Sequence, residues 1–167
     1  KKMMAGQISW APKLDTINGK IVFDGSIVPG PGLLNNPVEL TVEKGVITKI
    51  DGGIEAKQLE EFLRGFEDER MFKMAHISYG FNPGAKLTGD IVEDERVWGC
   101  TEWGIGNVGP QLTSDIPGGI EAPSHTDGIC LNSSVWLDGE LFLKDGEVVG
   151  PTDEIIELAR KAKKLEY

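Results

Sequence analysis

Residues 38–50 read Val-Glu-Leu-Thr-Val-Glu-Lys-Gly-Val-Ile-Thr-Lys-Ile, and this stretch carries the clearest structural signal in the chain. Apolar and polar residues alternate over residues 38–42, as they do in a strand with one buried face. Glu-Lys-Gly at residues 43–45 interrupts the alternation, and residues 46–50 are again rich in β-branched side chains. Two such runs joined by a short turn that contains glycine predict a β-hairpin.

The same turn chemistry recurs on both sides of this hairpin. Upstream, the apolar residues 21–23 and residues 26–28 flank Asp24-Gly25, which predicts a strand, a turn and a second strand. Downstream, residues 135–149 hold three short apolar runs separated by two Asp-Gly turns, which predicts a three-stranded meander. The abundance of glycine, at 22 residues, fits a strand-rich domain with many tight turns.

Two segments show helical periodicity. Residues 55–69 place Leu59, Phe62, Leu63 and Phe66 on one stripe, and residues 153–164 begin with capping residues after a proline and have one apolar side. We therefore predict an α+β fold: a strand-rich domain with a mainly antiparallel or mixed sheet and two helices. No low-complexity linker divides the 167 residues, so we predict a single domain.

The net charge and the apolar content of the chain limit the kinds of partner that it can bind and the compartment in which we expect it. The formal net charge of −10 opposes binding to nucleic acid or to an anionic membrane. No run approaches the roughly 20 apolar residues of a membrane helix, and the first residues lack an apolar export signal, so we expect a cytoplasmic protein. Cys100 and Cys130 lack CxxC partners and predict reduced thiols rather than a disulfide framework or structural zinc. The acidic charge and the many strand edges favour a homo-oligomer.

Two histidines and one aspartate form the candidate site. His125 and Asp127 are two residues apart in an extended segment, so both side chains point to one face. Adding His76, the only other histidine, completes the two-histidine, one-carboxylate set of iron sites that keep open positions. The same set suits zinc or manganese. The alternative is that both histidines are hydrogen-bonded structural residues.

Glu102 lies in an apolar, glycine-rich segment, where an unpaired buried carboxylate would be costly. It therefore pairs with a cation, such as Arg96 or a metal, or it faces solvent. No GxSxG elbow, Walker loop or helix-opening GxGxxG is present. A nucleophile paired with histidine, using Cys100, Ser78 or Ser124, remains open but has no recognisable sequence context.

Three blocks occur in an order that points to a known superfamily: residues 75–85 (AHISYGFNPGA), residues 93–106, which begin EDER, and residues 124–127 (SHTD). Together they resemble the aminopeptidase T superfamily, which also contains 2,5-dihydroxypyridine 5,6-dioxygenase. The resemblance extends from about residue 6 to residue 149. Members of the superfamily are about twice as long, so the chain resembles their C-terminal catalytic half and is expected to act on a small-molecule substrate.

The resemblance also separates the two branches of the superfamily. The peptidases hold two metals with two glutamates, two histidines and an aspartate, yet Gln7 stands where the first glutamate is expected. His76 occupies the second glutamate position, and Glu102 occupies a histidine position. The dioxygenases instead use a histidine at the position of His76, with His125 and Asp127, around one ferrous ion. This sequence is more similar to the dioxygenases.

The resemblance therefore implies a mononuclear Fe2+ enzyme that cleaves a hydroxylated pyridine or a similar aromatic ring, with Zn2+, Co2+ or Mn2+ as alternative metals. Its expected metal ligands are His76, His125 and Asp127. Glu102 is the candidate catalytic residue, as an extra ligand, an anchor for a ligand or a proton acceptor. Ser114 is the candidate for a hydroxyl residue near the metal. A metallo-aminopeptidase and a non-catalytic binding or assembly domain are the competing hypotheses.

Overall fold

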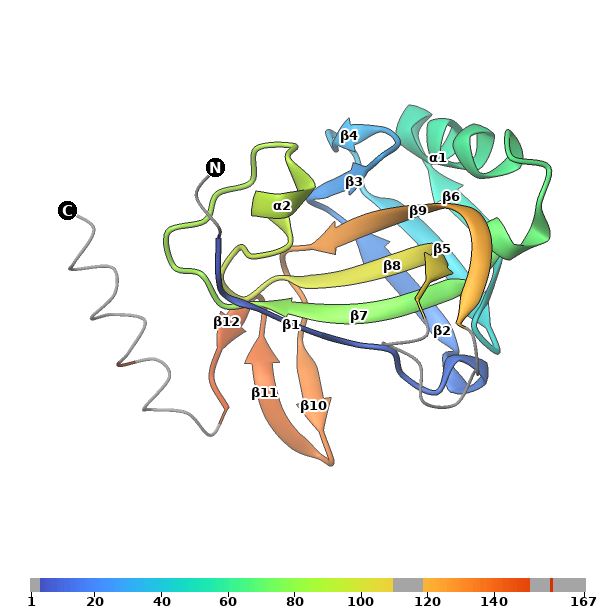
Figure 1. Ribbon diagram of the computed structural model, residues 1–167. Helices are drawn as coiled ribbons and strands as arrows, with labels where there is room; N and C mark the ends of the chain where they lie inside the picture. The colour runs from blue at the N-terminus through green and yellow to red at the C-terminus, as the bar shows by residue number, and fades with distance from the viewer. Residues whose placement is uncertain (1–3, 110–118, 151–156, 158–167) are drawn as a thin grey trace.

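A six-stranded antiparallel sheet forms the centre of the molecule in the computed structural model, which describes residues 4–109, 119–150 and 157 (Figure 1). Every pair of neighbouring strands in this sheet is antiparallel. In spatial order the strands are β1 (Gln7–Trp10), β7 (Met74–Gly80), β8 (Thr101–Val108), β9 (Ile120–Cys130), β3 (Ser26–Val28) and β4 (Gly32–Leu33).

Two three-stranded antiparallel sheets accompany the main one. The first contains β2 (Gly19–Phe23), β5 (Val38–Glu43) and β6 (Val46–Gly52), and the second contains β10 (Val135–Leu137), β11 (Glu140–Lys144) and β12 (Glu147–Val148). The predicted hairpin is confirmed, because β5 pairs with β6 through a turn in which Lys44 and Gly45 have φ of 49° and 75°. The predicted meander is likewise confirmed by the pairing of β10, β11 and β12.

The Asp24-Gly25 turn joins two sheets instead of pairing two strands. Both flanking strands exist where the sequence predicted them, but β2 pairs with β5 whereas β3 pairs with β4 and β9. The backbone N–H groups of Asp24 and Gly25 both donate to the carbonyl oxygen of Ile129, and the Asp24 carboxylate accepts from the N–H of Leu131. These contacts with β9 pass the chain from the small sheet to the main one.

Helices are few, as the α+β prediction required, and that class is confirmed. Within residues 4–109 and 119–150 they are α1 (Ile54–Arg64), the four-residue α2 (Ile91–Asp94) and two 3-10 turns, η1 (Leu14–Thr16) and η2 (Glu69–Phe72). Helix α1 buries Leu59 and Leu63 as predicted but ends five residues before the expected position 69. The reason is Glu67, whose φ of 52° is incompatible with a right-handed helix.

The other predicted helix, over residues 153–164, lies outside the described residues except for Glu157. In the described part of the chain, no helix has the length and apolar character needed to cross a membrane.

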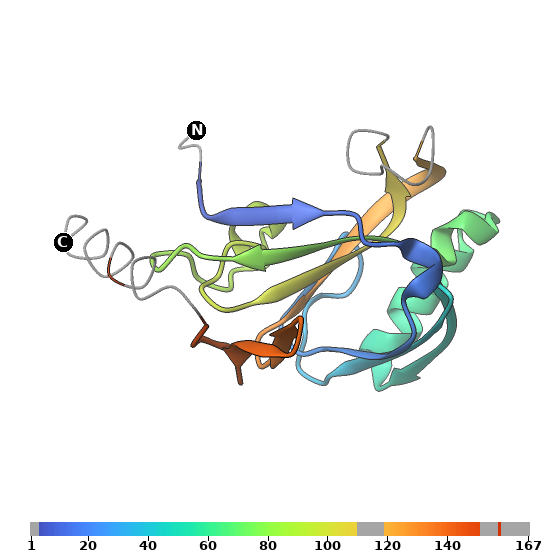
Figure 2. The same ribbon diagram turned by 90° about the horizontal axis from the view of Figure 1, so that it is seen from below.

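The apolar core occupies one side of the main sheet. Figure 2 shows α1 and both small sheets on that side. One cluster joins the sheet to β2, β5, β6 and α1 through fully buried side chains that include Phe23, Leu40, Leu59 and Ile105. A second cluster packs Ile77 and Tyr79 of the main sheet against the meander. The other side of the main sheet is therefore left to carry polar groups.

Candidate metal centre

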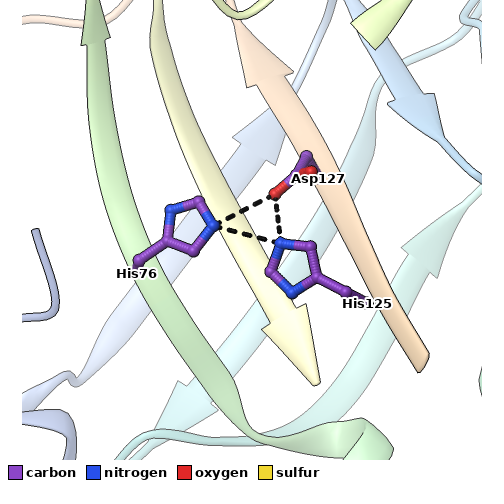
Figure 3. Close-up of side chains that lie close together, drawn as sticks. All are labelled: His76, His125 and Asp127. Atoms are coloured by element: carbon purple, nitrogen blue, oxygen red, sulfur yellow. Dashed lines mark hydrogen bonds and ion pairs between the residues drawn. The ribbon is translucent and has the colours of Figure 1, made fainter. Parts of the chain in front are cut away.

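Three adjacent strands of the main sheet position the candidate site. His76 lies on β7, whereas His125 and Asp127 lie on β9, and β8 runs between these two strands (Figure 3). The pairing places Gly104 of β8 opposite Asp127 and Gly106 opposite His125. Because side chains alternate along a strand, His125 and Asp127 point to the same face, as predicted.

A β-bulge turns His76 toward that face. Met74 pairs with Ile105 and Ile77 pairs with Trp103, so β7 holds one residue more than β8 between these two pairs. Met74 and Ala75 are both fully buried in the core, which strict alternation would not allow for two successive residues. The extra residue changes the direction of the next side chain, and this is the role that bulges often have beside functional sites.

Gly104 leaves the space in which the two imidazole rings meet. A Cβ built at this position would lie 2.6 Å from His76 Nε2 and 2.8 Å from His125 Cε1, closer than real Cβ atoms approach other atoms. Any residue other than glycine at position 104 would therefore force the two imidazole rings apart. Our sequence reasoning missed this residue, although the Trp-Gly-Ile-Gly run at residues 103–106 was a signal that backbone and side chains come close together there.

The three candidate ligand atoms lie close to the spacing of ligands around one metal ion. His76 Nε2 is 3.1 Å from His125 Nε2 and 3.4 Å from Asp127 Oδ1, and His125 Nε2 is 2.7 Å from the same oxygen (Figure 3). Ligands bound at about 2.1 Å lie about 3.0 Å apart at adjacent corners of an octahedron and about 3.4 Å apart in a tetrahedron. The structure thus brings together the three residues that the sequence grouped, and no other such group of His, Cys, Asp or Glu occurs within the described residues.

Hydrogen bonding directs the lone pair of His125 into this group. Its Nδ1 is 2.6 Å from the carbonyl oxygen of Asn107, which can only accept, so Nδ1 donates and Nε2 faces Asp127. Burial lowers the pKa of His125, but the hydrogen bond and charge of Asp127 outweigh this and leave it above the usual value. Burial would raise the pKa of Asp127, whereas the hydrogen bond with His125, helped by the nearby ring of His76, holds it well below its ordinary value. The arrangement therefore attracts either a proton or a metal ion.

Glu102 lies directly behind His76 and is completely buried. Its Oε1 is 3.5 Å from His76 Nδ1 and has no hydrogen-bond partner, while Oε2 accepts a hydrogen bond from the side-chain amide of Gln7 at 3.4 Å. Burial, followed by the nearby Asp127 carboxylate, raises the pKa of Glu102 well above its ordinary value. The alternatives of solvent exposure and of pairing with Arg96 are both wrong, since Arg96 binds Glu95 instead.

The remaining candidate nucleophiles do not form a recognisable dyad. Cys100 and Cys130 are buried and free, and burial raises the pKa of each thiol to about 12, so neither forms a thiolate readily at neutral pH. Ser78 Oγ lies 3.5 Å from His76 Nδ1, at the limit of hydrogen bonding. Ser114 lies outside the described residues.

Comparison with known proteins gives four findings. The family model of 2,5-dihydroxypyridine 5,6-dioxygenase matches residues 1–150. A protein of that name from Pseudomonas putida KT2440 is 29% identical over 150 residues, which are 85% of this chain and 42% of the relative. The solved structure of 2,5-dihydroxypyridine dioxygenase from the same organism superposes with a TM-score of 0.74 at 26% identity, covering 85% of this chain and 43% of that one.

AmpT from Thermus thermophilus also has a similar fold, with a TM-score of 0.66 at 16% identity over 87% of this chain and 40% of that one. The chain thus spans less than half the length of these relatives.

Proposed function

Because this chain belongs to the 2,5-dihydroxypyridine 5,6-dioxygenase family, as the sequence resemblance predicted, we propose that it supplies the metal centre of a ring-cleaving dioxygenase. The proposed metal is a single Fe2+ held by His76, His125 and Asp127. The proposed substrate is a hydroxylated pyridine or a similar aromatic ring. The observation that supports a metal most strongly is the convergence of three ligand atoms within 3.4 Å of one another.

Electrostatics explains why this convergence favours a cation. Asp127 is ionised, and the nitrogen lone pair of His125 points at it because Nδ1 is committed to Asn107. Lone pairs held this close repel one another unless a positive charge lies between them. Without a metal, a proton on His125 supplies that charge, and a metal ion would replace it.

The remaining residues of the site prepare it for this ion. Asp127 offsets part of the metal's charge, and Gly104 lets both rings approach it. Bound Fe2+ would supply the redox chemistry that combines O2 with an electron-rich ring, both oxygen atoms entering the cleaved product. Glu102 Oε1 lies 3.5 Å from His76 Nδ1, the ring nitrogen that does not face the proposed ion, which favours a role in supporting that ligand over direct metal binding.

The single-metal proposal rests on the donor set. Two histidines and one carboxylate are the ligands of mononuclear non-haem iron sites. The described residues contain one such group, and Gln7, where the peptidases would place a bridging glutamate, instead donates to Glu102. These observations disfavour the two-metal aminopeptidase hypothesis.

Metal analysis of the purified chain, loaded anaerobically with Fe2+, tests the proposal. We expect about one iron per chain and O2-dependent loss of a dihydroxypyridine substrate. Two zinc or cobalt ions per chain with release of N-terminal amino acids would establish the aminopeptidase hypothesis instead. Unchanged metal content and melting temperature in His76→Ala and His125→Ala would support the non-catalytic domain. The predicted homo-oligomer stays a prediction, which sedimentation analysis would test.

A further inference from the structure

The edge strand β1 directs two polar side chains toward the candidate metal centre. Gln7 and Ser9 point to the site face, where Gln7 donates to Glu102, while Trp10 points to the other face and stacks on Tyr79 at 5.1 Å. Ser9 pairs directly with Ser78 of β7 in the strand register. Strand β1 thus contacts, through its side chains, both Glu102 and Ser78, the two residues that lie near His76 Nδ1.

A line of hydroxyl groups leads from the surface to His76. Ser9 is exposed, and its Oγ lies 2.6 Å from Oγ of Ser78, which is completely buried. Ser78 Oγ in turn lies 3.5 Å from His76 Nδ1. Each hydroxyl can accept one hydrogen bond and donate another, so the line can run in a single direction from the imidazole to solvent.

His76 needs such a support because it lacks the one that His125 has. The Nδ1 atom of His125 is fixed by a backbone carbonyl oxygen at 2.6 Å. In the described part of the chain, the oxygens recorded near His76 Nδ1 are Ser78 Oγ and Glu102 Oε1, both at 3.5 Å. A metal-binding histidine usually donates from its other ring nitrogen, which fixes both the tautomer and the ring orientation.

We propose that Ser9 and Ser78 are positioning residues that hold His76 with its proton on Nδ1 and its Nε2 lone pair toward the ion. In this arrangement the Ser78 hydroxyl accepts a hydrogen bond from His76 Nδ1–H and donates one to the Ser9 hydroxyl, which in turn donates to water. Gln7 supports the same arrangement by holding Glu102. The inference rests on the proposed function, because His76 can bind a metal through Nε2 only when its proton is on Nδ1.

Metal affinity tests the proposal, with Co2+ as the probe. We expect Ser78→Ala to weaken Co2+ binding by about 10–100-fold, the usual loss for an outer partner of a ligand. Ser9→Ala should cause a smaller loss, and Ser9→Thr, which keeps the hydroxyl, should restore binding. Because Ser9 acts through Ser78, adding Ser9→Ala to Ser78→Ala should cause little further loss.

A second hydroxyl pair provides the matched control. Thr101 Oγ1 lies 2.8 Å from Ser133 Oγ, and Thr101 is also buried in the main sheet, but it precedes Glu102 and points to the opposite face. Ser133→Ala should leave Co2+ affinity unchanged. Equal effects of Ser9→Ala and Ser133→Ala, or full additivity of Ser9→Ala and Ser78→Ala, would overturn the proposal.

The histidine tautomer gives a readout that does not depend on metal. The chain has only two histidines, so 15N NMR of the metal-free protein at about pH 8 resolves each ring. We expect His76 as the Nδ1–H tautomer in the wild type and as a mixture in Ser78→Ala, with His125 unchanged. An Nε2–H tautomer of His76 in the wild type would refute the positioning role. If the wild type bound no metal, the proposed function would be refuted. The NMR measurement of the His76 tautomer would still decide whether Ser78 positions that ring.

Discussion

Replacing Gly104 by alanine should abolish metal binding while leaving the fold intact. The new Cβ would lie 2.6 Å from His76 Nε2, which is 0.8 Å less than the 3.4 Å at which ordinary contact begins. It would also lie 2.8 Å from His125 Cε1. At least one ring must therefore move by a distance comparable to a third of a metal–ligand bond of about 2.1 Å.

The expected loss of affinity exceeds the roughly 10–100-fold caused by removing an outer partner, because a ligand itself is displaced. The cost to folding is smaller. Overpacking typically costs about 1–3 kcal/mol, and alanine recovers about 0.5–1 kcal/mol in a strand relative to glycine. Since the His125 side chain is 30% exposed, its ring can swing toward solvent and relieve the contact.

Calorimetric titration with Co2+ and thermal melting of the metal-free protein would measure the two effects separately. Gly65→Ala is the matched control, because Gly65 is exposed and has right-handed helical dihedral angles that alanine readily adopts. Binding of Co2+ by Gly104→Ala with wild-type affinity would refute the argument that the two rings meet across β8.

Three further predictions follow from the charges of the site. Asp127→Asn should weaken metal binding by more than about 100-fold, as measured by Co2+ titration, since it removes the anionic ligand; a loss below about 10-fold would show that Asp127 is not a ligand. Metal affinity should fall as pH decreases through the raised pKa of His125, because protons then compete for Nε2; a flat affinity between about pH 8 and pH 6 would contradict this. Folding raises the pKa of Glu102, so above the ordinary pKa of glutamate the folded metal-free protein binds more protons than the unfolded chain, and its stability should decrease as the pH rises. Denaturant unfolding at several pH values should show a weaker pH dependence for Glu102→Gln than for the wild type. An unchanged pH dependence in this variant would contradict the raised pKa of Glu102.

Local patterns were sufficient for much of the fold. The 38–50 hairpin and the 135–149 meander depend on turns of two or three residues, so alternation and glycine position predict them. The Asp24-Gly25 turn has the same local chemistry, yet its partner is Ile129, more than one hundred residues away. Helix α1 stops early because of one left-handed residue, Glu67, which helical periodicity does not reveal.

The candidate site divides in the same way. The shared face of His125 and Asp127 follows from their spacing, which is a local property. The approach of His76 to this pair depends on the strand order, on the bulge in β7 and on the space left by Gly104. Each of these depends on how segments far apart in the sequence pack together, which local patterns do not reveal. His76 could be proposed from the sequence because it is the only other histidine, whereas the burial of Glu102 could be recognised only once its neighbours were placed.

The most direct test of the metal centre is an anomalous-scattering map of crystals grown after anaerobic Fe2+ loading, recorded on both sides of the iron edge and of the zinc edge. We predict one iron peak, about 2.1 Å from His76 Nε2, His125 Nε2 and Asp127 Oδ1. The absence of a peak between these atoms in fully loaded protein, or two peaks bridged by carboxylates, would contradict the account.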